Sequence, residues 1–119
     1  GAVGRFTLPL YFGRADAEAA SVRAAVGVLT VELARLDAAC AALDAGTPFL
    51  AGTAAATAAD CAVYPMIRSV QRALEKPAAA AFDIPFRDLR GVHPALGTWM
   101  ARVESLPGYE QTFPPHWRS

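Results

Sequence analysis

The stretch TAADCAVYPM, residues 57–66, gathers a hydroxyl, an acid, a thiol and a phenol within a few positions. Thr57 and Asp60 have the spacing of a capping box, in which the hydroxyl accepts a backbone N–H of the first turn and the carboxylate reaches back to the cap N–H. The acid also lies at the positive end of the helix dipole. A loop precedes the pair and an apolar stripe of helical period follows it. We therefore predict that a helix begins at Thr57.

A catalytic or metal-binding role for Asp60 is the alternative. Such a role needs partners that its neighbourhood in the sequence lacks, because His93 and His116 lie beside prolines far along the chain. No H-x-x-x-H or H-x-x-E spacing occurs. We favour the cap over the catalytic role and predict no metal site.

Three other reactive side chains have simpler interpretations. Cys40 falls on a predicted helix seam and Cys61 at the position of a hydrophobic staple, so both are expected to be buried core thiols. Tyr64 is expected to be a packed ring with a hydrogen-bonded hydroxyl rather than a catalytic phenol.

Composition limits the classes of protein to consider. The chain has 119 residues, of which 54% are hydrophobic, enough for one packed domain over residues 1–119. Eleven basic and eleven acidic side chains cancel without a charge run, so a nucleic-acid partner is not expected. No apolar stretch approaches the roughly 18 residues of a membrane span, and no signal peptide is visible. Two cysteines without CxxC spacing fit a reduced, cytoplasmic setting.

The longest predicted helix follows the first fifteen residues. Its apolar side chains alternate in steps of four and three over three heptads: Val22, Val26, Leu29, Leu33, Leu36, Cys40 and Leu43. Asp16 is the expected N-cap and Gly46 the expected residue just beyond the helix end. We expect Val28 and Val31 to widen the buried face, as in a helix within a bundle.

The remaining segments complete an all-α pattern, because alanine is abundant and strand-like alternation is absent. Residues 4–13 are the tail of a helix or an irregular apolar strip, and the loop 46–52 should place Phe49 and Leu50 in the core. The helix from Thr57 should kink at Pro65 and stop before Pro77. Its expected inner face is Val63, Ile67, Val70 and Leu74.

The last third of the chain should hold a loop and one more helix. Residues 78–91 are predicted to be a loop with a short helical turn, and its apolar side chains should cover the edges of the core: Phe82, Ile84, Phe86 and Leu89. A helix should begin at Pro94 and stop at Pro107. Its predicted stripe is Leu96, Trp99, Val103 and Leu106. The tail 109–119 is expected to lie extended over the bundle.

Four motifs in order give a family resemblance. They are PFLAG (48–52), TAADCAVYP (57–65), HPALGTWMARVESLPGYEQT (93–112) and TFPPHW (112–117). Together they resemble the C-terminal helical domain of cytosolic glutathione transferases, and the last resembles the tails of bacterial members. One departure is the small staple pair Ala56 and Cys61, where the family usually has bulky residues.

The resemblance implies a partner domain and a substrate. Family members carry a preceding thioredoxin-like domain that binds the co-substrate glutathione and activates its thiol. None of that domain lies in these 119 residues, so we expect a piece of a longer protein that is not catalytic alone and holds no cofactor. Homodimerisation is expected on the same ground.

In the family, the helical domain forms one wall of the cleft for a hydrophobic electrophile. The matching positions are Phe6, Tyr11, Arg68, Ser69 and Arg72. The alternative is that the aromatic pair are core or dimer contacts and that the arginines are solvent-facing charge. For the whole chain, the rival function is a non-catalytic interaction module with the same helical fold. An unrelated helix bundle is a third interpretation.

Overall fold

The computed structural model describes residues 2–106, and these form an all-α bundle, as predicted. None of the described residues lies in a β-strand, and one isolated β-bridge joins Asp44 and Thr47. The elements in chain order are α1 (Ala2–Tyr11), α2 (Ala19–Ala41), α3 (Ala58–Leu74), the 3₁₀ helix η1 (Pro77–Phe82), α4 (Leu89–Val92) and α5 (Pro94–Glu104). The predicted course of the tail 109–119 lies outside the described residues.

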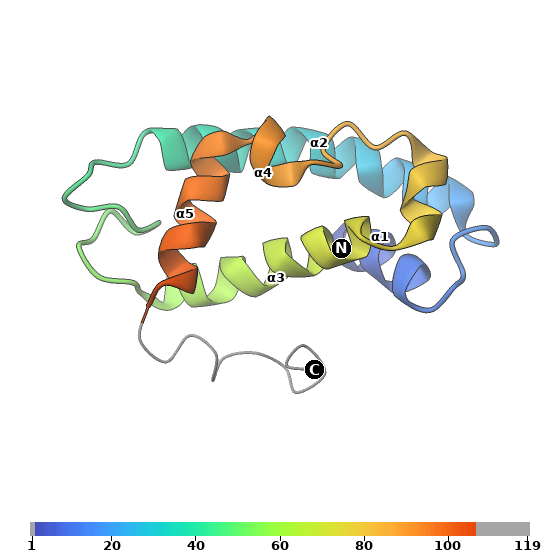
Figure 1. The fold of residues 1–119 in the computed structure, drawn as a ribbon, viewed down its shortest axis with the longest axis horizontal. Coiled ribbons are helices and arrows are strands. Elements are labelled where there is room, and N and C mark those ends of the chain that lie inside the picture. The colour runs from blue at the N-terminus through green and yellow to red at the C-terminus, as the bar shows by residue number, and fades with distance from the viewer. Residues whose placement is uncertain (1, 107–119) are drawn as a thin grey trace.

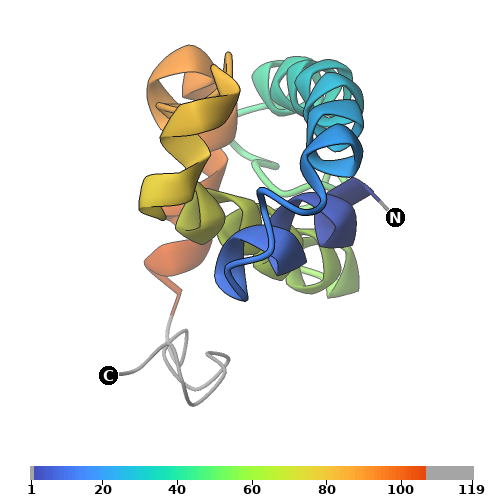
Figure 2. The ribbon, with the colours of Figure 1, turned by 90° about the vertical axis from the view of Figure 1, so that its right-hand side faces the viewer.

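Two long helices set the shape of the molecule. Figure 1 shows α2 and α3 running lengthwise in opposite directions, joined at one end by the loop 42–57. The short helix α5 crosses between them at that end, and α1 packs against both at the other end (Figure 2). The first turn of α5 is fixed to α2, because the Leu96 N–H donates to Asp37 Oδ1 at 2.9 Å.

The first segment is a regular helix rather than an irregular strip. Helix α1 ends at Tyr11, and Gly13 follows with a φ of +68°, which suits a residue without a Cβ. The Arg14 N–H donates to the Pro9 carbonyl at 2.8 Å, which is the long bond of a Schellman motif. This motif turns the chain from α1 towards α2.

Both predicted ends of the long helix are wrong. α2 begins after Glu18, which makes no side-chain capping bond, and not after Asp16. The turn that follows Gly13 already has helical hydrogen bonding, since Glu18 N–H donates to the Arg14 carbonyl at 3.0 Å, and no Asp16 cap is formed. At the other end, α2 stops at Ala41, and Gly46 lies later, in the tight turn that the Asp44–Thr47 bridge closes.

The seam of α2 is mostly buried, but its predicted width is wrong. Val22, Leu29 and Leu33 lie in the core, whereas Val28 is 40% exposed and Val31 is 51% exposed. These two valines lie on the other side of the helix from the neighbours that cover the seam.

The second half of the fold follows its predicted helices closely. α3 begins at Thr57, continues through Pro65 and stops before Pro77, with Ile67, Val70 and Leu74 buried and Val63 half-buried. The kink at Pro65 stays a prediction. α5 begins with Pro94 and buries three of its four predicted stripe residues, Leu96, Trp99 and Val103. Leu106 is partly buried, as is Leu50 in the loop where Phe49 enters the core.

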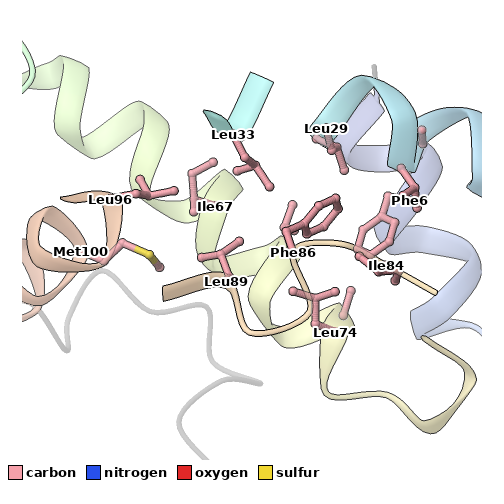
Figure 3. Packing of buried hydrophobic residues seen from close by; sticks show 14 of the residues in the cluster. Phe6, Leu29, Leu33, Ile67, Leu74, Ile84, Phe86, Leu89, Leu96 and Met100 are labelled. Carbon is pink, nitrogen blue, oxygen red and sulfur yellow. The ribbon is translucent and has the colours of Figure 1, made fainter. Parts of the chain in front are cut away.

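The segment between η1 and α5 supplies the centre of the core rather than its edge. Phe86 and Leu89 are almost fully buried, and Figure 3 shows Phe86 among side chains of α1, α2 and α3. Its ring packs on Phe6 with centroids 5.9 Å apart. Ile84 is also buried, whereas Phe82 packs against the core from its margin. A loop side chain therefore fills the space between the two long helices.

Candidate functional site

Asp60 is a buried acid, with 1% of its surface exposed. One carboxylate oxygen, Oδ2, accepts the Thr57 N–H at 2.9 Å and completes the capping box at the start of α3. The other, Oδ1, accepts the Leu50 N–H at 3.0 Å and the Trp99 indole N–H at 2.9 Å. We call this arrangement the Asp60 junction. It joins the loop before α3, α3 itself and α5.

The electrostatics of the Asp60 junction favour a structural role. Burial alone raises the pKa of Asp60, but the hydrogen bonds from Leu50, Thr57 and Trp99 outweigh burial and hold its pKa below the usual value. A carboxylate that is buried, ionised and bonded at both oxygens is a poor proton acceptor for a substrate. No group of histidine, cysteine or acidic side chains among residues 2–106 could hold a metal ion.

The neighbours of Asp60 in the sequence separate into inward and outward residues. Tyr64 is buried, stacks at a tilt on Trp99 and donates its hydroxyl to Glu104 Oε2 at 2.5 Å, as its interpretation as a packed, bonded ring required. Cys61 is exposed, so its assignment to the core is wrong. Because Asp60 points into the core, the side chain of Cys61, the next residue of the helix, points away from it.

Cys40 is buried, as predicted. Burial, followed by the charges of Asp37 and Asp60, raises the pKa of its thiol to about 11. A thiol with this pKa carries almost no thiolate at neutral pH, so Cys40 is a core side chain and a poor nucleophile.

A second polar cluster joins α3 to the end of α5. Arg90 donates to both oxygens of Glu104, with Nη1 to Oε1 at 2.8 Å, and also reaches Gln71 Oε1. Burial raises the pKa of Glu104, but the bonds from Arg90 and Tyr64 and the charge of Arg90 lower it below its usual value overall. The charges of Arg90 and Glu104 thus pair with each other inside the structure.

A groove lies between α1 and the C-terminal half of α3, with a volume of about 450 Å³. We call it the α1–α3 groove. Its lining residues are Thr7, Leu8, Tyr11, Phe12, Ser69, Arg72 and Lys76. The Tyr11 hydroxyl donates to the Ser69 carbonyl at 2.9 Å, which fixes one helix to the other. Lys76 Nζ lies 5.4 Å from the centroid of the Tyr11 ring, in the range of a cation–π contact.

The structure brings together three of the five site residues named from the sequence. Tyr11, Ser69 and Arg72 all line the α1–α3 groove. Phe6 lies elsewhere, because it is fully buried in the core against Phe86. Arg68 is directed to the polar side of α3, where it donates to Gln71 Oε1 at 3.3 Å and lies 4.0 Å from Glu75.

Four lining residues were not found from the sequence, but helical spacing held a signal for them. Leu8 and Phe12 are four residues apart on either side of Tyr11, and Lys76 follows Arg72 by four. Side chains with this spacing share one helix face. Thr7 precedes Tyr11 by four residues and carries the same signal.

Comparison with protein families gives one match. The model of the glutathione S-transferase C-terminal domain matches residues 14–102. The chain belongs to this family. No curated protein and no solved structure matches it. The match includes α2, the Asp60 junction and the α3 side of the groove, whereas Leu8, Tyr11 and Phe12 precede it. None of the described helices is long and apolar enough to cross a membrane.

Proposed function

We propose that this chain is the C-terminal domain of a glutathione S-transferase and that its α1–α3 groove forms part of the binding site for a hydrophobic electrophile. The observation that carries the proposal is the juxtaposition of Tyr11, Ser69 and Arg72 with exposed apolar side chains in one groove. The volume of about 450 Å³ fits a small aromatic molecule. The family match supports the glutathione-dependent chemistry.

In the proposed reaction, the groove positions the electrophile beside glutathione bound by a thioredoxin-like domain of the same protein. The thiolate sulfur forms a bond to the electrophilic carbon, and the leaving group departs with the bonding pair. The contribution of this chain is orientation of the electrophile and exclusion of water from it. The Tyr11 hydroxyl already donates its proton to the Ser69 carbonyl. Tyr11 therefore contributes its ring to the wall of the groove rather than a hydrogen bond to the electrophile.

The rival interaction module has less support. Its expected signature is a contiguous exposed apolar patch. The large apolar side chains that are exposed in the described part of the chain are distributed over four helices and the turn after α1: Leu8, Phe12, Val28, Val31, Met66 and Val92. A cytoplasmic location and a homodimer belong to the same proposal and rest on the family alone.

A pair of matched truncations tests the groove in the full-length, two-domain protein. Leu8 and Val92 are equally exposed, at 48% and 49%, but Leu8 lines the groove and Val92 lies on α4. Leu8→Ala should raise the KM for chlorodinitrobenzene by about fivefold through lost apolar contact, with the KM for glutathione unchanged. Val92→Ala should change neither. Equal kinetics for the two variants would contradict the proposal.

A further inference from the structure

Three threonines lie inside the helices of the described chain, and one of them differs from the other two. Thr30 in α2 and Thr98 in α5 each donate their hydroxyl to the backbone carbonyl four residues earlier, at 2.7 and 3.0 Å. This bond is a common local partner for a threonine within a helix. The hydroxyl of Thr7, in α1, forms no hydrogen bond with any other residue of the range 2–106. Its proton is therefore available to another acceptor.

Burial makes this unpaired hydroxyl unusual. Thr7 is 4% exposed, and the other buried polar side chain among the described residues, Asp60, accepts protein donors at both oxygens. Buried polar groups are nearly always hydrogen-bonded, because a group that loses water without gaining a partner costs free energy. Thr7 also lines the α1–α3 groove. A molecule in that groove therefore lies where the missing acceptor is needed.

The surroundings of Thr7 in the groove define the kind of acceptor. Leu8 and Phe12 are exposed beside it, and the Tyr11 ring follows four residues later on the same face of α1. The Tyr11 hydroxyl already donates to the Ser69 carbonyl at 2.9 Å. Thr7 thus places one neutral donor beside an apolar and aromatic wall. An aromatic molecule with an uncharged oxygen acceptor, such as a carbonyl group, matches this arrangement.

We propose that Thr7 determines the specificity of the α1–α3 groove, and that its hydroxyl donates a hydrogen bond to an uncharged oxygen of an aromatic electrophile. This inference rests on the proposed function and narrows the substrate from hydrophobic electrophiles in general to those with a neutral acceptor. A site with a buried hydroxyl discriminates against a molecule of the same shape that lacks the acceptor, because the hydroxyl is then left unpaired. Thr7 orients the electrophile and takes no part in bond making.

The test uses this chain together with its proposed thioredoxin-like domain, and it compares acetylbenzyl chlorides with isopropylbenzyl chlorides of nearly equal shape. The substituent is para or meta to the chloromethyl group, so the oxygen is presented at two positions in the groove. In each reaction the glutathione sulfur bonds to the benzylic carbon and chloride leaves with the bonding pair. Thr7→Val keeps the shape of the side chain and removes the donor. It should lower kcat/KM about fivefold for at least one acetyl isomer, the effect of one neutral hydrogen bond, and less than twofold for both isopropyl compounds.

Two variants control for the shape of the side chain and for the loss of a hydroxyl elsewhere. Thr7→Ser keeps the donor and should retain the wild-type preference for the acetyl compounds. Thr30→Val removes a hydroxyl outside the groove and should change the kinetics with neither class of electrophile. In urea unfolding, Thr7→Val should not lower the free energy of unfolding, because the Thr7 hydroxyl has no partner in the described chain. A lowered value would assign that hydroxyl a structural partner and overturn the inference.

The kinetic outcomes separate this inference from the proposed function. Equal losses for Thr7→Val with acetyl and isopropyl compounds, or an equal loss for Thr7→Ser, would overturn the inference, because the side chain would then act through its shape. Wild-type kinetics for Thr7→Val with all four compounds, beside a raised KM for Leu8→Ala with chlorodinitrobenzene, would overturn the inference alone. Wild-type kinetics for both variants would overturn the proposed function of the groove as well.

Discussion

The Asp60 junction and the α1–α3 groove are both built on α3, yet they have opposite characters. The junction lies at the first turn of the helix, is closed to solvent and matches each carboxylate oxygen with protein donors. The groove lies at the last turns, is open and has two cations with no acid in its described lining. A closed polar cluster whose groups bond to one another stabilises a fold, whereas an open groove lined by apolar and polar side chains suits a ligand.

Removal of Asp60 should have the largest effect on stability. Asp60→Ala leaves the Leu50 and Thr57 N–H groups and the Trp99 indole N–H without their acceptor, and it removes the capping carboxylate. We expect a loss of about 3 kcal/mol or more in the free energy of unfolding, because each buried donor left unsatisfied costs about 1–3 kcal/mol. Urea unfolding followed by circular dichroism measures it.

Two further variants are compared with Asp60→Ala in the same unfolding measurement. Asp16→Ala removes an exposed acid and should change the free energy of unfolding by less than about 0.5 kcal/mol. Trp99→Phe removes a single donor to Asp60 and keeps most of the ring, so it should cost less than Asp60→Ala and remain foldable if the latter does not. A cost for Asp60→Ala no greater than that for Asp16→Ala would refute the structural role of the junction.

The pH dependence of stability should show a smaller effect of the same carboxylate. The pKa of Asp60 is lower in the folded chain than its ordinary value, so the ionised form stabilises the fold at neutral pH. The difference in unfolding free energy between wild type and Asp60→Asn should be constant from about pH 7 to 5. It should shrink as the pH falls below about 4, towards and through the lowered pKa. Glu104 titrates in both proteins and cancels. A difference that stays constant or grows below pH 4 would contradict the assignment.

In the Asp60 junction, contacts between residues close together in the sequence were predicted, whereas contacts between distant residues were not. The cap depends on Thr57 and Asp60, three residues apart, and their spacing is visible in the sequence. The bond from Trp99 spans 39 residues and no local pattern contains it. Asp16 failed as a cap for a local reason, because the turn that follows Gly13 already has helical hydrogen bonding before α2 begins.

Burial was harder to predict than helix position. Val28 and Val31 are apolar, but they lie outside the buried seam of α2 and are exposed in the described part of the chain. Phe6 was named for the cleft wall and lies in the core, because Phe86 from the distant loop packs on it. For the groove, the resemblance supplied Tyr11, Ser69 and Arg72, whereas Lys76, which lies just beyond α3, was not named although it follows Arg72 by four residues.

The most direct test of the account is a crystal structure of this chain together with its proposed thioredoxin-like domain, in complex with the dinitrophenyl conjugate of glutathione. We predict that the dinitrophenyl ring lies in the α1–α3 groove, within about 4 Å of Leu8 and Tyr11 side-chain atoms. We also predict that the Asp60 junction stays intact and untouched by the ligand. A conjugate whose ring lies away from α1 and the end of α3 would contradict the assignment of ligand binding to the α1–α3 groove. A conjugate that contacts Asp60 would contradict the purely structural role of the Asp60 junction.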